Sequence, residues 1–103
     1  MPAVRSTERT RDETALAVRY LLQLLAEKVP GNTVEVRVPP FGAVQVIEGP
    51  RHTRGTPPNV VEMDAATWIA LATGTVAWVD ASTRIHASGT RADLSGLLPL
   101  LRQ

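Results

Sequence analysis

Cysteine is absent from the 103-residue chain, and aromatic residues make up only 4% of it. Without cysteine there is neither a disulfide framework nor a thiolate metal site, which is compatible with a reducing compartment. The core must instead be built mainly from leucine, valine and alanine. The amino-terminal residues lack the apolar core of a signal peptide, and no apolar run approaches the roughly 20 residues that cross a bilayer. We therefore expect a soluble protein of the cytoplasm, with no integral membrane association.

An excess of charge of either sign is also missing. The chain has 11 basic and 10 acidic side chains, which give a formal net charge of +1. This balance does not favour nucleic acid or an anionic membrane as a partner. The length fits one domain, which we place at residues 10–103, after a polar and flexible stretch at residues 1–9.

Residues 10–31 carry a clear helical pattern. Thr10 and Glu13 have the spacing of a capping box, in which each side chain accepts a hydrogen bond from the other residue's backbone N–H. Apolar residues then recur at intervals of three and four, which predicts an amphipathic helix that ends at Pro30 and Gly31. The apolar stripe consists of Val18, Leu21, Leu22, Leu25 and Val29. A helix with such a face must lie on something, most simply a sheet.

Strand signals follow in four places. Residues 33–38 alternate strictly between apolar and polar, and similar patterns occur at 43–48, 59–63 and 83–88. Alternation of this kind predicts half-buried strands. Because the first three follow one another with short connections, we expect them to pair antiparallel.

Two more helices are predicted among and after these strands. Asp64 is suited to cap a helix that ends before Gly74. A last helix is expected from residue 90, with Pro99 kinking or shortening it. Residues 75–81 fit either a short helix or an extended connection. The element order predicts an α+β domain, in which helices pack on one face of a largely antiparallel sheet of four to five strands.

No catalytic or metal-binding motif is visible. The sequence contains no GxSxG, no HExxH and no glycine-rich phosphate loop. His86 alternates along a polar strand face, which favours a solvated histidine over a catalytic one. His52 could act as a base with Glu62 or Asp64, but a general base needs a second placed group. We therefore expect no metal and no cofactor, and keep a small enzyme using His52 as a remote alternative.

The stretch "GPRHTRGTPPN", residues 49–59, crowds cations and prolines between two strand patterns. Arg51 and Arg54 could form a fork for a carboxylate or a phosphate. The alternative is a rigid connection whose arginines pair with Glu48 or Glu62, and this is the more conservative interpretation of the Arg51–Pro58 loop.

The second half of the chain concentrates its large apolar residues. Trp68 and Trp78 can line a wide pocket or fill a core. The tail "LLPLL" is short and interrupted by Pro99. It could lie as a lid over a groove, or dock on another subunit.

Several stretches of this chain resemble the bacterial branch of the sterol carrier protein family. They are "PPNVVEMD", the helix "W…LATG" that ends at Gly74, and "HASGTRADLSGLLPLL", within a similarity over about residues 18–101. The resemblance implies a layered domain with an apolar tunnel between helices and a five-stranded sheet. It also implies binding of a sterol, a fatty acid or an acyl-CoA without chemical turnover. Two departures are that we count four strands, and that the stretch between Trp78 and Ile85 is short.

The resemblance also suggests site residues. A head group would be held by Arg51, His52 and Arg54 at the tunnel mouth. The alternative function is an interaction or dimerisation module with a collapsed pocket, a homodimer forming through the C-terminal helix. The candidate ligand-binding residues are Phe41, Val46, Met63, Trp68, Leu71, Trp78, Leu98 and Leu101.

Overall fold

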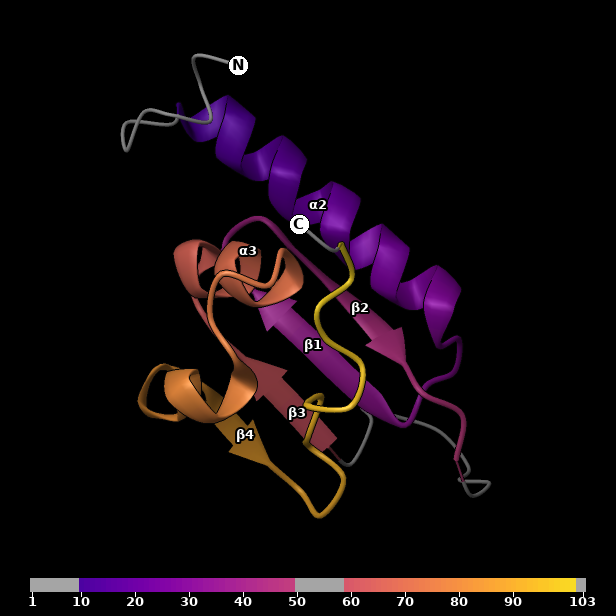
Figure 1. The fold of residues 1–103 in the computed structure, drawn as a ribbon. Coiled ribbons are helices and arrows are strands. Elements are labelled where there is room, and N and C mark those ends of the chain that lie inside the picture. The colour runs from indigo at the N-terminus through magenta and orange to yellow at the C-terminus, as the bar shows by residue number, and fades with distance from the viewer. Residues whose placement is uncertain (1–9, 50–58, 102–103) are drawn as a thin grey trace.

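The computed structural model describes residues 10–49 and 59–101, and Figure 1 shows how its elements are arranged. The predictions for residues 1–9 and for Arg51, His52 and Arg54 fall outside these ranges. Each of the four predicted strands is present, although the last is short. In chain order the elements are α2 (Arg11–Lys28), β1 (Val34–Val38), β2 (Gly42–Val46), β3 (Asn59–Glu62), α3 (Ala65–Ala72), η1 (Trp78–Arg84) and β4 (His86–Ser88).

Helix α2 begins at the predicted capping box. The Thr10 hydroxyl accepts the backbone N–H of Glu13 at 3.0 Å, and the Glu13 carboxylate accepts the backbone N–H of Thr10 at 3.0 Å. Two otherwise unsatisfied donors of the first turn are thereby paired. The apolar stripe packs against β2 and α3, and its buried residues are Val18, Leu21, Leu22 and Leu25.

The sheet has the strand order β2-β1-β3-β4 and is mixed. β1 and β2 form an antiparallel hairpin, and β3 and β4 also pair antiparallel, but β1 and β3 are parallel. The expectation that the first three strands pair antiparallel is therefore wrong for β3. β2 and β3 lie on opposite sides of β1, so β3 does not pair with the strand that precedes it in the chain, and it runs antiparallel to β2 and parallel to β1.

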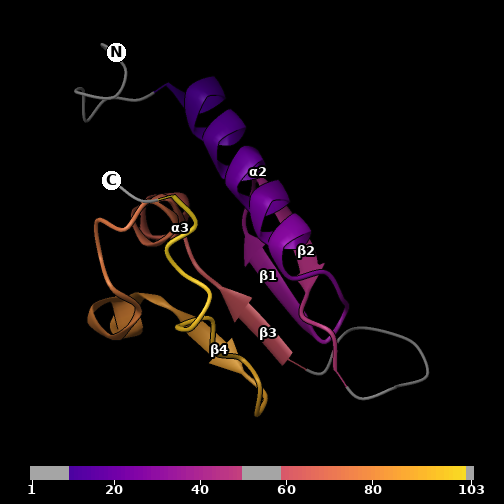
Figure 2. The ribbon, with the colours of Figure 1, turned by 45° about the vertical axis from the view of Figure 1, so that its right-hand side comes forward.

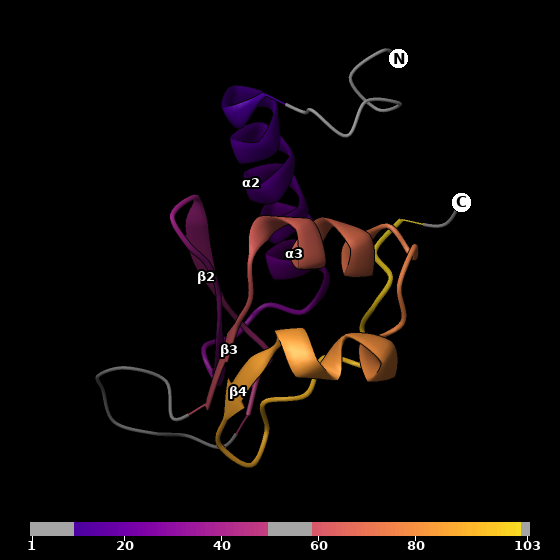
Figure 3. The same ribbon diagram turned by 90° about the vertical axis from the view of Figure 1, so that its left-hand side faces the viewer.

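The two faces of the sheet differ sharply. On β1, Val34, Val36 and Val38 are buried beneath the helices, whereas Glu35 and Arg37 point to the opposite face. Figure 3 shows the helices gathered on one side of the sheet. The predicted α+β layering, with helices on one face, is confirmed.

The turn from the sheet into α3 follows the sequence prediction. The Asp64 carboxylate accepts the backbone N–H of Thr67 at 2.8 Å and caps α3. Gly74 follows the helix with φ of +83°, a left-handed conformation that costs glycine little. The ambiguous stretch at residues 75–81 leads into the 3-10 helix η1, which occupies part of the predicted fourth strand and leaves β4 with three residues.

The predicted C-terminal helix is wrong. Residues 92–101, here called the C-terminal segment, form turns and irregular backbone. Pro99 has no N–H to continue a helix, and the backbone N–H groups of Leu100 and Leu101 both donate to the Ala72 carbonyl, at 2.8 and 3.0 Å. The segment thus docks against the end of α3, between α3 and α2 (Figures 1 and 2).

The core lies between the sheet and the layer formed by α2, α3 and the C-terminal segment. Trp68 is the largest fully buried side chain, and Leu94 of the C-terminal segment is also 0% exposed. Leu22, Leu25 and Leu71 fill the space around them. In the described ranges, no helix is long and apolar enough to cross a membrane.

Candidate functional site

A pocket of about 470 Å³ opens where α3, η1 and the C-terminal segment meet, and we call it the α3–η1 pocket. Helix α3 contributes Leu71, the residues before and within η1 contribute Val76 and Trp78, and the C-terminal segment contributes Leu98 and Pro99. The lining is largely apolar. A concave apolar site of a few hundred Å³ is typical of small-molecule binding sites.

Three of the candidate ligand-binding residues meet in this pocket: Leu71, Trp78 and Leu98. They come from three separate elements, so only the fold brings them together. The C-terminal segment is held on α3 by the hydrogen bonds of Leu100 and Leu101 with the Ala72 carbonyl. These bonds place the preceding residues, Leu98 and Pro99, beside α3.

The other candidates lie elsewhere. Val46, Met63 and Trp68 are buried in the core, with exposed fractions of 0 to 2%. Phe41 lies in the β1–β2 turn, and the Arg11 guanidinium lies 5.3 Å from its ring centroid. Leu101 is 38% exposed. A role for these residues in ligand binding stays a prediction.

The two tryptophans therefore occupy different environments. Trp68 is 0% exposed, and its indole N–H donates to the Val18 carbonyl of α2 at 3.3 Å. Trp78 is half-buried and lines the α3–η1 pocket. A ligand in this pocket would meet Trp78 directly and Trp68 only through the packed core.

A second pocket, of about 500 Å³, lies where α2 and β2 end, and we call it the α2–β2 pocket. Its lining combines apolar residues with two acidic ones and a glycine: Val29, Pro30, Ile47 and Leu97, then Glu48 and Asp93, and Gly96.

Ile47 of this pocket has φ of +69°, a left-handed conformation that is rare for a β-branched residue. Its backbone is held from both sides: its N–H donates to the Val29 carbonyl at 2.7 Å, and its carbonyl accepts from the Thr33 N–H at 3.0 Å. Gly31 packs against the Ile47 backbone so closely that a Cβ atom would have no room there. These contacts fix the Ile47 side chain in the pocket wall, and nothing in the local sequence signals this.

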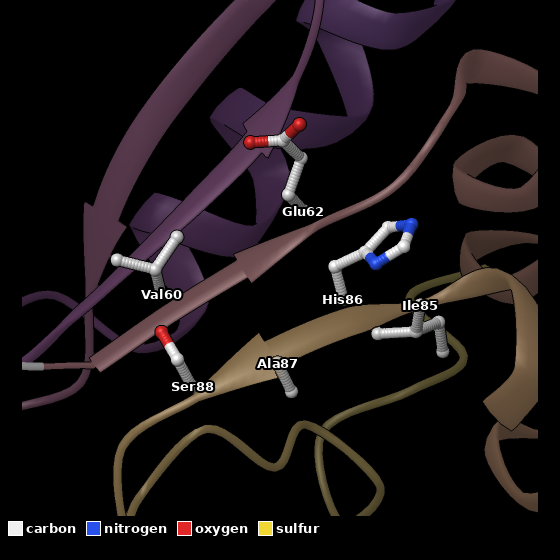
Figure 4. A pocket seen from close by; sticks show the side chains of 6 residues that line it. All are labelled: Val60, Glu62, Ile85, His86, Ala87 and Ser88. Atoms are coloured by element: carbon white, nitrogen blue, oxygen red, sulfur yellow. The ribbon is translucent and has the colours of Figure 1, made fainter.

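The uncovered face of the sheet holds a third, polar hollow of about 440 Å³. Figure 4 shows that Val60, Glu62, His86 and Ser88 project from one side of β3 and β4, with Ala87 turned the other way. His86 is exposed, so its placement agrees with the interpretation as a solvated histidine. The strand register sets His86 opposite Glu62.

Arg37 completes a charged row on the same face. Its guanidinium lies 3.2 Å from the Glu35 carboxylate and 4.0 Å from that of Glu62. The hydrogen bond with Glu35, supported by its negative charge and that of Glu62, raises the pKa of Arg37. All three side chains are partly exposed, and exposed ion pairs contribute little to stability. In the described residues, no group of three or more His, Asp or Glu side chains could hold a metal ion.

The two carboxylates considered as partners of His52 have structural roles. Glu62 faces Arg37, and Asp64 caps α3. The backbone N–H of Thr67 donates to Asp64 and lowers the pKa of its carboxyl group. The carboxyl group is ionised at neutral pH, which suits a helix cap.

The sheet, its single helical layer and the α3–η1 pocket together define a small α+β domain with an apolar pocket. The chain matches the family described as bacterial SCP ortholog over residues 10–100, and it belongs to this family. The resemblance to the sterol carrier proteins is thereby confirmed. No curated protein matches the chain. Membership suggests a lipid-binding carrier role, because that is the general function of the sterol carrier proteins.

Proposed function

We propose that the protein carries an apolar ligand of the fatty acid, acyl-CoA or sterol type without changing it chemically, and that the α3–η1 pocket receives the alkyl part. The observation that supports this most is the apolar lining of that pocket in a member of the SCP family. Trp78, Leu71 and Leu98 would contact the ligand.

Apolar contact favours binding but does not by itself account for a micromolar affinity. Burying one methylene group is worth about 0.8 kcal/mol, so a ten-carbon chain gains about 8 kcal/mol before the costs of association. This gain exceeds the lowest estimates of those costs, about 4 kcal/mol, but a micromolar dissociation constant needs about 8 kcal/mol net, so the head group must contribute as well. The volume of about 470 Å³ lies in the range of known ligand pockets. No catalytic group is needed to explain such binding.

A head group needs a polar partner, and Arg51, His52 and Arg54 remain our proposal for it. Their guanidinium and imidazole groups suit the carboxylate of a fatty acid or the phosphates of an acyl-CoA. Location in the cytoplasm also stays a prediction. In the described residues, the C-terminal segment forms no helix through which the predicted homodimer could assemble.

Tryptophan emission tests the proposal. We expect decanoic acid, added below its micelle concentration, to change the emission of the protein in a saturable way through Trp78. The Trp78→Phe variant retains Trp68 alone and should show a much smaller change, while still being stabilised against heat by the ligand. Lauroyl-CoA and cholesterol, titrated in parallel, identify the ligand class. If none of the three alters the emission or the melting temperature, the carrier function is wrong.

A further inference from the structure

The C-terminal segment contributes to the lining of both apolar pockets. Asp93, Gly96 and Leu97 line the α2–β2 pocket, whereas Ser95, Leu98 and Pro99 line the α3–η1 pocket. Neighbouring residues of one short segment thus form walls of two hollows, of about 500 and about 470 Å³. Figures 1 and 2 show this segment passing between α2 and α3 on the helical side of the sheet.

Leu94 is the residue of this segment that enters the core. Its side chain is 0% exposed and belongs to the cluster of core residues, while the residues on either side of it, Asp93 and Ser95, are exposed. Its isobutyl group has the same chemistry as a short stretch of alkyl chain. Leu94 lines neither pocket, but it fills apolar space at the point of the chain where the lining passes from Asp93 of one pocket to Ser95 of the other.

The segment is held mainly at its ends. One residue before it, the Arg91 N–H donates to the Asn59 side chain at 2.9 Å, and at its end the backbone N–H groups of Leu100 and Leu101 donate to the Ala72 carbonyl. Between these anchors, an exposed hydrogen bond from the Lys28 ammonium to the Leu97 carbonyl, at 2.9 Å, reaches another element. A segment with few backbone hydrogen bonds opens at a lower free energy than the strands and helices around it.

We infer that the two pockets are halves of one ligand site, and that residues 93–99 move aside as a unit so that an alkyl chain replaces Leu94. This inference rests on the proposed carrier function. Leu94 is then a specificity-determining residue, because its side chain competes with the ligand for the same space. The apparent affinity is lowered by the fraction of molecules in which the segment is closed.

The first test measures opening without any ligand. Since the chain has no cysteine, a Leu94→Cys variant carries a single thiol whose reaction with a disulfide reagent reports exposure. The matched control is Val36→Cys, which is equally buried but lies in the central strand β1. In the absence of denaturant, we expect Leu94→Cys to react at least about tenfold faster than Val36→Cys. Low concentrations of urea should hardly change the rate for Leu94→Cys, because local opening exposes little surface. Equal rates with equal urea dependence would overturn the inference.

The second test measures binding of decanoic acid by calorimetry. Leu94→Ala removes the competing side chain, so we expect about tenfold tighter binding than in the unmodified protein, because the closed state is destabilised. Leu24→Ala, on a half-buried α2 position that lines neither pocket, is the control for general loosening. Unchanged or weaker binding by Leu94→Ala overturns the inference.

The two tests also separate the inference from the proposed function. If the unmodified protein binds decanoic acid but Leu94→Cys stays as protected as Val36→Cys, the displaceable segment is wrong and the carrier function stands. If Leu94→Cys reacts quickly but neither the unmodified protein nor Leu94→Ala binds decanoic acid, lauroyl-CoA or cholesterol, the carrier function is wrong. The proposed ligand role of Leu94 is then wrong with it.

Discussion

Replacing Trp68 with alanine is expected to lower the free energy of unfolding by about 3–5 kcal/mol, the usual cost of truncating a large buried aromatic residue. Trp68 is 0% exposed, and its indole N–H joins α3 to the Val18 carbonyl of α2. The change leaves a cavity and removes one hydrogen bond to the Val18 carbonyl, which keeps its bond within α2. Since domains of this size are stable by about 5–15 kcal/mol, this is a large share of the total.

Urea unfolding followed by far-ultraviolet circular dichroism measures this effect without relying on tryptophan emission. The matched control is Trp78→Ala, which removes the same side chain from a half-buried position at a pocket. We expect it to cost less than half as much, because less surface was buried and no hydrogen bond is lost. Equal losses for the two variants would show that Trp78 is also a core residue and would remove it from the proposed site.

The second large effect is expected at Asn59, the buried first residue of β3. Its side-chain NH2 group donates to the Thr33 backbone carbonyl at 3.0 Å, and its side-chain oxygen Oδ1 accepts the Arg91 backbone N–H at 2.9 Å. Asn59→Ala leaves the Thr33 carbonyl and the Arg91 N–H without this partner. An unsatisfied buried group costs about 1–3 kcal/mol, so we expect a loss of about 2–3 kcal/mol in the free energy of unfolding.

Asn32→Ala is the control, because Asn32 is the same residue type at an exposed position one residue before Thr33. The two variants should differ clearly in their urea midpoints. The free energy of unfolding of Asn32→Ala should lie within about 0.5 kcal/mol of that of the unmodified protein. An Asn59→Ala variant as stable as Asn32→Ala would mean that water replaces both hydrogen bonds. In that case Asn59 does not anchor the start of the C-terminal segment.

Local signals predicted the elements of this fold well. The capping box at Thr10 and Glu13 and the cap at Asp64 are present, because each depends only on residues within one turn. The alternation of Val34, Val36 and Val38 predicted the buried face of β1 for the same reason. Each of these features is specified within a few residues of sequence.

Non-local pairing could not be predicted in the same way. The antiparallel expectation for β3 failed because strand order depends on where the crossover places β3, and neither strand pattern carries that information. The C-terminal helix was wrong because the leucine spacing that suggests a helical stripe is equally compatible with Leu94 filling the core while Leu97 and Leu98 line two different pockets.

The candidate site was predicted only in part. Leu71, Trp78 and Leu98 share a pocket, but composition alone could not separate the pocket tryptophan from the core tryptophan. Ile47 and its left-handed backbone were missed, because a β-branched residue gives no signal for that conformation. A polar residue at the start of an apolar strand was the one available signal for Asn59.

Methyl NMR spectra of the leucine- and valine-labelled protein, recorded during a titration with decanoic acid, test the proposed ligand site most directly. We predict saturable shifts at Leu71, Val76 and Leu98, with Val60 on the uncovered sheet face unaffected. Shifts centred on Val60, or none that saturate at any of these methyl groups, would contradict binding in the α3–η1 pocket.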